Sequence, residues 1–407
     1  MRRLRIFNFL IFIFPLPVFA QICGFTHQNN AEIERYTEGY VRQFLQNNIA
    51  PRAVARIPVV VHVVWKNELE NISDAQIQSQ IDALNRDFRK RNTVNPVFLR
   101  FAVDCEIEFC LAKRDTNGNA TTGIVRKQSR FTDIDIGSSY FDTVSRRVFY
   151  TSHGGSDAWN PQKYLNIWVC AFSNGFLGVA SSPAKALNLP KEDGIVVDYR
   201  AFGTVGNLRD GRRNGRIAVH ELGHYFDLLH IWGSDTTCID DDLVEDTPRQ
   251  EGPREGCPVD LLKSCTNTLD YFRNYMDYTN DDCMSFFTNG QKARMWANLT
   301  GFRASLLASN ACDPVSVTTI HKASVEVYPN PAQSVLSIAF KSEHPNILKN
   351  FRLFDCLGRV VSENFIPTTR DTEGVYDLHL EGLPNGFYLL SINIDNQLFT
   401  KKIIIEK

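Results

Sequence analysis

The sequence has no excess of either charge sign and, after its first twenty residues, no long apolar run. Its 44 basic and 46 acidic side chains give a formal net charge of -2, which offers no electrostatic reason to expect nucleic acid or an anionic membrane as a partner. A stretch of about 20 apolar residues is needed to cross a bilayer, and none follows the N-terminus. The 407 residues, 43% of them hydrophobic, instead favour a soluble or surface-attached protein of two or three domains.

The N-terminus is typical of an export signal. MRRLR forms a basic start, IFNFLIFIFPLPV follows as an apolar core, and VFA precedes Gln21 as a small-residue cleavage site. A membrane anchor is the alternative, but Pro15 and Pro17 interrupt the apolar run before it is long enough to span. We therefore expect residues 1–20 to be a signal peptide, and export permits disulfides.

The pattern after the signal peptide predicts a pro-segment and then a large α/β domain. Residues 21–56 are polar, with an amphipathic helix expected over AEIERYTEGYVRQFLQNN, and we interpret them as a pro-segment. Residues 57–312 begin with the β-branched strand IPVVVHVVW and a helix whose start has a capping box, Ser73 with Gln76. The elements expected in this domain are strands over 57–65, 105–114, 164–172 and 194–202, helices over 72–92, 215–227 and 289–309, and an irregular Cys- and Asp-rich stretch over 235–285.

The character of the chain changes near residue 313. Residues 313–322 are expected to be a linker, and residues 323–407 contain short alternating strands separated by turn residues. This pattern predicts a small all-β sandwich.

The stretch HELGHYFDLLHIWGSD contains a candidate metal site. On a helix, His220 and His224 project from one face at the separation that two ligands of one tetrahedral ion need. With His230 as a third ligand, one coordination position stays open, which is typical of a catalytic zinc site. Glu221 lies beside them, where its carboxylate can take a proton from the attacking water and return it to the leaving amine. The alternative, a chance spacing, is rare in a chain with nine histidines.

Asp227 stands where such motifs usually carry glycine. The chain must turn back here to bring His230 to the ion, and helices commonly end on a left-handed residue, for which Asn and Asp are tolerated next after glycine. We predict that Asp227 ends the helix in this conformation at a small strain cost.

These motifs resemble the pappalysin family of metzincin metallopeptidases. The other matching stretches are IPVVVHVVW, LNRDFR, LNIWV, DDLVEDTP, NYMDY and CMSFFTNGQKARM, so the resemblance covers roughly residues 23–312. It implies a metzincin-like α/β catalytic domain with a twisted mixed sheet, an active-site helix and an irregular C-terminal subdomain. It also implies a zinc-dependent endopeptidase that is made as a latent zymogen.

The resemblance assigns roles to three residues near NYMDY. Met276 would pack beneath the zinc, although a methionine alone is more often a core residue, and Tyr278 would stabilise the oxyanion. Asp281, with Asp282 adjacent, would lie at the base of the primed-side pocket and favour Arg or Lys, because a buried carboxylate pairs with a cation. The alternatives for Asp281 are a solvated acidic loop and a calcium ligand.

A calcium site is expected in DDLVEDTP, residues 241–248, because this non-helical stretch concentrates hard oxygen ligands. Family members bind calcium in the equivalent region, so the resemblance implies Asp246 and Thr247 as ligands. A solvated acidic turn is the alternative.

All ten cysteines lie beyond the signal peptide, and most should pair in an exported protein. Spacing does not fix their connectivity, but the resemblance suggests two cross-links in the irregular region, Cys238 with Cys265 and Cys257 with Cys283. Three cysteines on expected strands could pair or stay buried thiols: Cys105, Cys110 and Cys170. Cys312 and Cys356 have no assigned partner.

Cys23 is either an ordinary disulfide partner or a switch. In related zymogens a pro-segment cysteine ligates zinc and keeps the enzyme latent, and a thiolate is a good fourth ligand. If Cys23 acts in this way, a cut near Arg52 or Arg56 would release it.

The C-terminal module offers no catalytic cluster, and its residues alone indicate a compact β domain for carbohydrate or surface binding. VYPNPAQSVLSIAF, CLGRVV, LPNGFYLLSI and TKKIIIEK resemble the C-terminal sorting domain of the type IX secretion system. The resemblance implies transport by that machinery, with the enzyme released or held at the outer cell surface.

The sequence therefore predicts a secreted or surface-held zinc metalloendopeptidase that acts on proteins or peptides, with Zn²⁺ and Ca²⁺ as cofactors, no nucleic-acid partner and a monomeric state. An extended substrate should lie antiparallel to an edge strand, which we expect within 175–200. The competing hypothesis is a cell-surface adhesin or binding protein with a non-catalytic zinc site. Glu221 argues against it, because zinc binding alone does not need that carboxylate.

Overall fold

The computed structural model describes Cys23 and residues 31–47, 53–130, 146–172, 175–234, 237–314, 324–341, 349–366, 373–394 and 397–407. The chain divides into two compact units between Val315 and Ser316. The expected signal peptide lies outside the described residues. No helix in the described ranges has both the length and the apolar character to cross a membrane.

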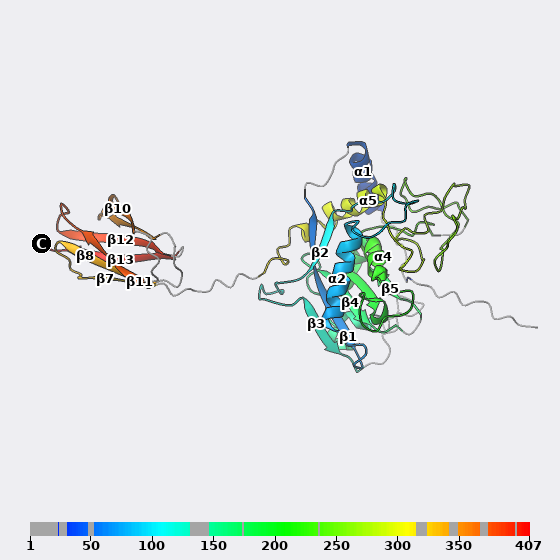
Figure 1. Cartoon of the computed structure of the whole chain (residues 1–407), viewed down its shortest axis with the longest axis horizontal. Coiled ribbons are helices and arrows are strands. Elements are labelled where there is room, and N and C mark those ends of the chain that lie inside the picture. Colours follow the sequence, from blue (N-terminus) through cyan, green and yellow to red (C-terminus); the bar gives the residue numbers. More distant parts are fainter. Residues whose placement is uncertain are drawn as a thin grey trace, which may run out of the picture. The chain divides into compact units, whose positions relative to one another are not determined.

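The described part of the first unit contains helices on both sides of a six-stranded sheet (Figure 1). Its helices are α1 (Ala31–Asn47), α2 (Asp74–Phe88), α3 (Pro183–Asn188), α4 (Arg216–Tyr225), α5 (Asn289–Thr300) and α6 (Ala304–Leu307), with short 3₁₀ turns η1 (Arg147–Phe149), η2 (Thr151–His153), η3 (Pro190–Glu192) and η4 (Tyr199–Ala201). Its strands are β1 (Ala55–Trp65), β2 (Ile107–Leu111), β3 (Ile124–Gln128), β4 (Leu165–Cys170), β5 (Gly178–Ala180) and β6 (Gly194–Asp198).

Strand β1 lies inside this sheet, whose order is β2-β1-β4-β6-β5, with β3 paired to β1 farther along the same edge. All pairs are parallel except β5, which runs antiparallel to β6 at the edge. The sheet is therefore mixed, which confirms the predicted α/β fold. The apolar run of β1 follows from burial on both faces: Val59, Val61 and Val63 join the main core, and Val60 and Val64 join two smaller clusters.

Helices α2 and α4 pack against one face of the sheet and against each other (Figure 1). The hydroxyl of Ser73 caps α2 by accepting a hydrogen bond from Gln76 N at 3.1 Å, which is one half of the predicted capping box. The reciprocal bond from Ser73 N to the Gln76 side chain is not formed, so the full capping box was wrong. The Gln76 amide nitrogen instead donates to the carbonyls of Tyr199 and Phe202, at 3.0 and 2.9 Å. This side chain therefore ties the start of α2 to the turn that follows β6.

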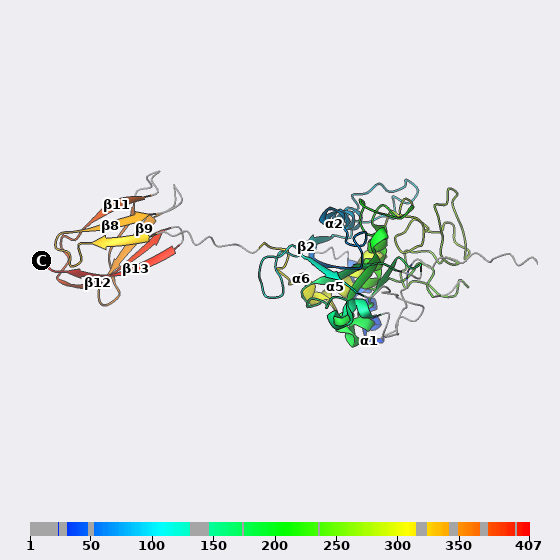
Figure 2. The same cartoon turned by 90° about the horizontal axis from the view of Figure 1, so that it is seen from below.

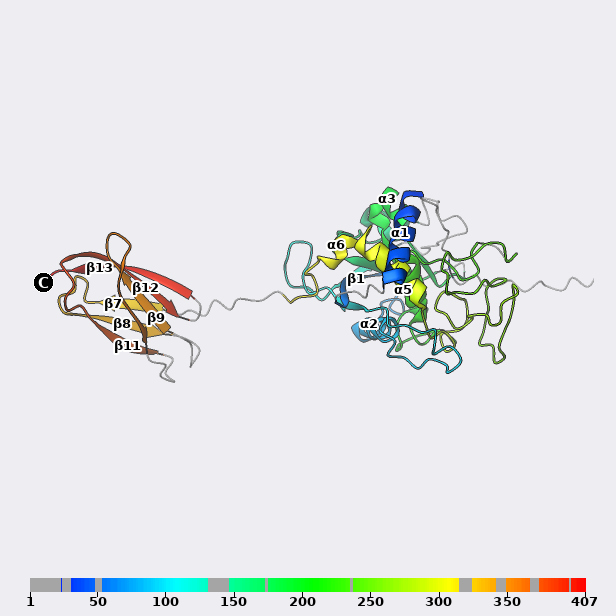
Figure 3. The same cartoon turned by 90° about the horizontal axis from the view of Figure 1, so that it is seen from above.

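Helix α1 of the expected pro-segment packs along α5 (Figures 1 and 3). The single closing helix expected over 289–309 is wrong, because it divides into α5 and α6 at Gly301. A Cβ atom on Gly301 would lie 2.3 Å from Cε1 of Tyr36 on α1. The break and the missing side chain together make room for the approach of α1.

The second unit is all-β, as predicted, and consists of a four-stranded sheet, β10-β9-β12-β13, and a three-stranded sheet, β11-β8-β7 (Figure 2). Alternate residues of the two sheets form one apolar core, which includes Leu336, Ile338, Leu353, Leu390 and Ile392. The strands are β7 (Ser324–Tyr328), β8 (Val335–Lys341), β9 (Lys349–Phe354), β10 (Val360–Ile366), β11 (Glu373–His379), β12 (Gly386–Ile394) and β13 (Gln397–Ile405).

Candidate metal centre

Helix α4 fixes the orientation of two buried histidines. The Nδ1 atom of His220 donates to the carbonyl of Tyr275, and Nδ1 of His224 donates to the carbonyl of Leu228, both at 2.7 Å. A carbonyl oxygen can only accept, so each imidazole carries its proton on Nδ1. The lone pair of each Nε2 is then available for a metal ion.

His230 approaches the same point from the segment that follows α4. The Nε2 atom of His224 lies 3.1 Å from Nε2 of His220 and 3.1 Å from Nε2 of His230. Two nitrogen ligands of one tetrahedral zinc ion would be about 3.3 Å apart. Burial lowers the pKa of His220 to about 4 and the pKa of His230 well below its usual value, which favours the neutral, metal-binding form. The donor set and its spacing fit zinc.

Asp227 lies in the turn that connects α4 to His230. Its φ angle is +79°, the left-handed conformation that the sequence predicts for it. The amide of Leu228 then donates to the carbonyl of Gly223 at 2.9 Å and closes the turn. An imidazole–indole stack holds His230 against Trp232, with ring centroids 4.5 Å apart.

Glu221 is fully buried beside the histidines. Burial raises its pKa to about 8, although a hydrogen bond from Cys23 opposes this shift. Its neighbour on the edge strand β5 is Gly178, where a Cβ atom would lie 2.5 Å from Oε1 of Glu221. Only glycine lets β5 pass so close to this carboxylate, and no feature of the sequence pattern had indicated Gly178.

Cys23 is the fourth member of the cluster. Its Sγ and one ring nitrogen of each of His220, His224 and His230 all lie within 4.8 Å of one another. The thiol donates to Oε2 of Glu221 at 3.5 Å, and the backbone pairs in parallel with Gly178. The disulfides of the described residues join other cysteines.

Met276 and Tyr278 border the cluster from the irregular stretch. Met276 is fully buried, and a Cβ atom on Gly223 of α4 would lie 2.3 Å from its Sδ, so the thioether packs directly against the helix. The Tyr278 hydroxyl donates to the carbonyl of Cys23 at 3.5 Å. Burial raises the pKa of Tyr278 well above its usual value, so the phenol stays protonated.

Asp281 caps the other end of α4. Its Oδ2 accepts from the amides of Asn214 and Arg216, at 3.1 and 3.2 Å, and its Oδ1 lies 3.7 Å from Nη1 of Arg212. The Asp281 side chain is fully buried, whereas the adjacent Asp282 forms an exposed hydrogen bond with Asn214. Asp281 therefore lies in a structured, basic environment and not in a solvated loop.

Two carboxylates of the stretch DDLVEDTP have different contacts: Asp246 caps a helix, and Asp242 contacts Thr247. Asp246 caps α5, since its oxygens accept from the Thr288 hydroxyl at 2.6 Å and from Gly290 N at 2.9 Å. The Thr247 hydroxyl lies 2.7 Å from Oδ1 of Asp242, a buried residue that the sequence interpretation did not single out. Among the described residues, no hydrogen-bond partner is found for Asp242 Oδ2.

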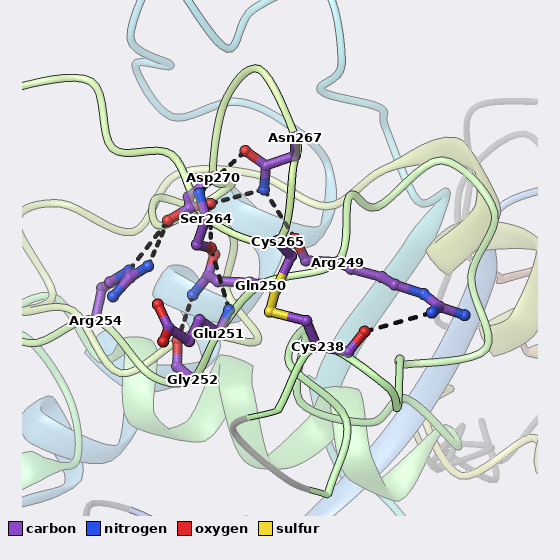
Figure 4. Close-up of a disulfide and its surroundings, with 10 residues drawn as sticks. All are labelled: Cys238, Arg249, Gln250, Glu251, Gly252, Arg254, Ser264, Cys265, Asn267 and Asp270. Atoms are coloured by element: carbon purple, nitrogen blue, oxygen red, sulfur yellow. Dashed lines mark hydrogen bonds and ion pairs between the residues drawn. A yellow bond between two sulfur atoms is a disulfide. The ribbon is translucent and has the colours of Figure 1, made fainter.

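Two disulfides restrain the irregular stretch: Cys238 with Cys265, and Cys257 with Cys283. These are the pairs that the resemblance suggests, and a third disulfide joins Cys110 to Cys312. Figure 4 shows the contacts around the first of them.

The buried carboxylate of Asp270 is the centre of those contacts. It accepts hydrogen bonds from Arg254, Ser264 and Asn267, at 2.6, 2.8 and 2.7 Å (Figure 4). Polar contacts of this kind replace the missing helix and strand hydrogen bonds.

Comparisons with known proteins give two family matches. Residues 150–300 match the M43 peptidase family, described as pregnancy-associated plasma protein-A, and residues 326–406 match the secretion system C-terminal sorting domain. An extracellular metalloprotease of Pyricularia oryzae is 32% identical over 263 residues, which cover 63% of this chain and 78% of the relative.

Two solved structures are also similar. Mature mirolysin of Tannerella forsythia in complex with a cleaved peptide is 43% identical, with a TM-score of 0.59 over 63% of this chain and 97% of that chain. A promirolysin mutant of the same organism is 38% identical, with a TM-score of 0.61 over 71% of this chain and 97% of that chain.

Proposed function

The chain belongs to the pappalysin, or M43, family of zinc metallopeptidases, and on that premise we propose that His220, His224 and His230 hold the catalytic zinc and that Glu221 moves the proton. The observation that carries this proposal is the convergence of three imidazole nitrogens and a thiol beside a buried carboxylate. The protein is secreted or held at the cell surface, is made as a zymogen, and hydrolyses peptide bonds.

Glu221 is assigned as base and then acid. A bound zinc ion would polarise the peptide carbonyl and make water a stronger acid. The carboxylate of Glu221 takes a proton as the water oxygen attacks the carbonyl carbon, and gives it to the amide nitrogen as the C–N bond breaks.

Tyr278 is assigned to the oxyanion. Its protonated phenol already donates to a carbonyl, that of Cys23, in the pro-segment. A substrate carbonyl at that place would receive the same hydrogen bond as negative charge develops on its oxygen. Met276 supports the site by packing on Gly223 beneath the histidines.

Cys23 is assigned as the latency switch, with its sulfur as the fourth zinc ligand. Support comes from its position in the cluster and from its backbone, which runs parallel to the edge strand β5 at Gly178. A substrate that adds antiparallel to β5 would run in the opposite direction. The pro-segment thus fills the site without presenting a peptide bond in the productive orientation.

The activating cut is assigned before β1. Arg56 lies inside this strand, and its neighbour Ala55 pairs with Ile107, so a cut there would need the strand to open. Arg52 lies outside the described residues. We therefore favour Arg52 over Arg56.

A cleavage assay tests the zinc and proton assignments. The processed chain should cleave denatured protein, lose this activity with a chelator, and regain it with zinc. Glu221→Ala should lower kcat by at least about 10²-fold, the range in which general acid–base groups act. Equal cleavage by both proteins would contradict the assignment of Glu221, and an adhesin with a vestigial site would cleave in neither form.

Asp281 is proposed to favour Arg or Lys on the primed side of the cut. Its Oδ1 already faces a cation, Arg212, at 3.7 Å, so a basic substrate side chain must share or replace this contact. In peptide mapping, Asp281→Asn should reduce the preference for basic residues, and Arg212→Met should leave or increase it. A spread of primed-side residues in the wild type would contradict the proposal.

Calcium is proposed to bind between Asp242, Asp246 and Thr247. The buried Oδ2 of Asp242 supports this site, because a hard cation would satisfy it. Calcium should raise the Tm of the wild-type chain but not of the Asp242→Asn variant. Equal shifts in both proteins would place calcium elsewhere.

The C-terminal unit is assigned to export by the type IX machinery, after which the enzyme is released or held at the surface. The monomeric state remains a prediction, which light scattering of the full chain would test.

A further inference from the structure

Asp227 does more than end a helix. Glycine would adopt its left-handed backbone without strain and without a side chain, whereas this chain places a carboxylate there and buries it to 7% exposure. A strained, buried aspartate is stable only if its charge is compensated. Two of its partners lie on α5 and α1.

The first partner is Arg294 on α5. Its Nη2 lies 3.0 Å from Oδ2 of Asp227, and its Nε donates to the carbonyl of the same residue at 2.6 Å. The guanidinium therefore holds both the side chain and the backbone of the turn. This turn contains Leu228, whose carbonyl orients His224, and it leads to His230.

The second partner is Thr37 on α1. Its hydroxyl is buried, with the residue 1% exposed, and it donates to Oδ2 of Asp227 at 3.4 Å. The surrounding contacts of α1 are apolar, with Phe44 in the main core and Tyr36 against Gly301. The carboxylate thus joins a pro-segment helix to the turn that places two zinc ligands.

We propose that Asp227 is a positioning residue and the polar docking point for pro-segment helix α1, so that docking of α1 and the order of the Leu228–His230 turn support each other. The proposal rests on the proposed function, since it describes how the pro-segment regulates the same metal centre. While α1 is bound, Thr37 and Arg294 share the carboxylate. After α1 has left, the pair with Arg294 remains and continues to support the turn.

The test uses the full chain with Glu221→Gln, which prevents self-cleavage and keeps an oxygen near Cys23. Thr37→Val removes the hydroxyl and keeps the shape of the side chain, and Asp227→Gly removes the carboxylate and relieves the backbone strain. Glu38→Gln, on the exposed side of α1, is the matched control. Hydrogen exchange of the α1 amides reports docking, and transfer of zinc to a chromogenic chelator reports the order of the ligand turn.

Thr37→Val should speed amide exchange in α1 by roughly tenfold, a weakening typical of a lost hydrogen bond to a charged group. Asp227→Gly should speed that exchange to a similar degree and should also speed zinc transfer by roughly tenfold or more. Because both variants break one interaction, the double variant should exchange no faster than Asp227→Gly alone. Glu38→Gln should match the parent chain in both measurements.

Unchanged α1 exchange in Thr37→Val would overturn the docking role, and so would full additivity in the double variant. Unchanged zinc transfer in Asp227→Gly would overturn the positioning role. If Asp227→Gly does not fold, the comparison of Thr37→Val with Glu38→Gln still decides the docking role. A parent chain that binds no zinc would instead contradict the proposed function.

Discussion

The sheet-and-helix part of the catalytic unit and the stretch from Phe226 to Thr288 contribute to the same site by different means. In the first part, residues from Ala55 to Tyr225, side chains follow the periods of strands and helices, and the apolar ones form a continuous core. The described residues between Phe226 and Thr288 contain no helix or strand. There, apolar side chains such as Phe272 and Phe286 join the same core, but without a regular period. Disulfides and the separate hydrogen bonds of buried carboxylates such as Asp270 and Asp277 add to the order of this stretch.

The residues of the candidate metal centre are therefore positioned in two different ways. The regular part supplies His220, His224 and Glu221, whose relative positions follow from one turn of α4. The irregular part supplies His230 and Tyr278, whose positions depend on contacts far apart in the sequence. The two parts should therefore differ in what destabilises them. Reductant opens two disulfides inside the irregular part and one, Cys110 with Cys312, that reaches the sheet, whereas acid acts on the sheet through His62.

The largest expected effect is on the irregular part. Replacing Cys238 and Cys265 by alanine should lower the free energy of unfolding by about 3–4 kcal/mol, because the disulfide closes a loop of intermediate length. Denaturant unfolding of the full chain, monitored for the catalytic unit, measures this loss. Hydrogen exchange should show faster opening of residues 237–288 than of α2.

Cys356→Ser is the control, since this exposed cysteine of the C-terminal unit forms no disulfide in the structure. It should leave the unfolding of the catalytic unit unchanged. Equal loss of protection in α2 and in residues 237–288 would mean that the two parts open together, which would contradict the comparison.

The next largest effect is a loss of stability in acid, which is expected from a histidine in the sheet. His62 lies in the central strand β1, with Nδ1 2.8 Å from the Ser156 hydroxyl and Nε2 3.0 Å from Oδ1 of Asn166. Burial lowers its pKa to about 4, from a usual value of 6.5. Between these values the unfolded chain binds a proton that the folded chain does not, so stability falls as the pH falls from 6.5 to 4, by about 3 kcal/mol in total.

Urea unfolding at pH 7 and at pH 4.5 measures this loss. Glutamine does not titrate, so His62→Gln should remove the share of the pH dependence that His62 contributes, even if it lowers stability at pH 7. His220 and His230, whose pKa values burial also lowers, should retain the rest. His153→Gln, at an exposed site, should keep the wild-type dependence. If both variants lose stability equally on acidification, the acid sensitivity does not come from the sheet.

The sequence predicted much of the regular part, because buried residues recur with the period of a strand or a helix, but it did not indicate β3 or α3 and gave no bounds for β5 within 175–200. Strand β1 and helix α4 begin and end within two residues of their predicted bounds, whereas α2 ends four residues early, at Phe88. The spacing of His220 and His224 alone indicates two ligands of one ion. The left-handed turn at Asp227 could also be predicted from the sequence, because few residue types tolerate that conformation.

The irregular part has no periodic pattern of apolar residues, so the roles of its residues could be predicted only from the resemblance to known enzymes. Spacing does not indicate that Asp281 caps α4 or that Asp246 caps α5, since these contacts join segments that meet only in the folded chain. Gly178 was missed for the same reason, because its missing side chain matters only where β5 passes Glu221.

A smaller effect is expected where the two parts meet. In Gly223→Ala the new methyl group would lie 2.3 Å from Sδ of Met276, so the buried thioether must move. Overpacking of this kind should lower the free energy of unfolding by about 2 kcal/mol. It should also speed zinc transfer to a chelator, because Met276 packs on α4, the helix that contains His220 and His224.

Gly39→Ala is the matched control, because no atom lies within 4 Å of the new methyl group and alanine favours the helix α1. It should not destabilise the chain. An unchanged unfolding midpoint in Gly223→Ala would show that Met276 has space to move, and would weaken the view that the two parts are tightly joined at the metal centre.

The smallest effect is expected at Thr288, where the irregular part ends and α5 begins. The Thr288 hydroxyl accepts from Gln291 N at 3.2 Å and donates to Asp246 at 2.6 Å, while Oε1 of Gln291 accepts from Thr288 N at 2.9 Å. Thr288→Ala should therefore lower the free energy of unfolding by about 1 kcal/mol, and Thr288→Ser, which keeps the hydroxyl, should lower it by much less. If local anchoring at this boundary orders the irregular part, hydrogen exchange in Thr288→Ala should rise from Asp246 to Thr288 and stay unchanged in β1. A rise confined to the first turn of α5 would instead show that the cap at Thr288 does not order the stretch before it.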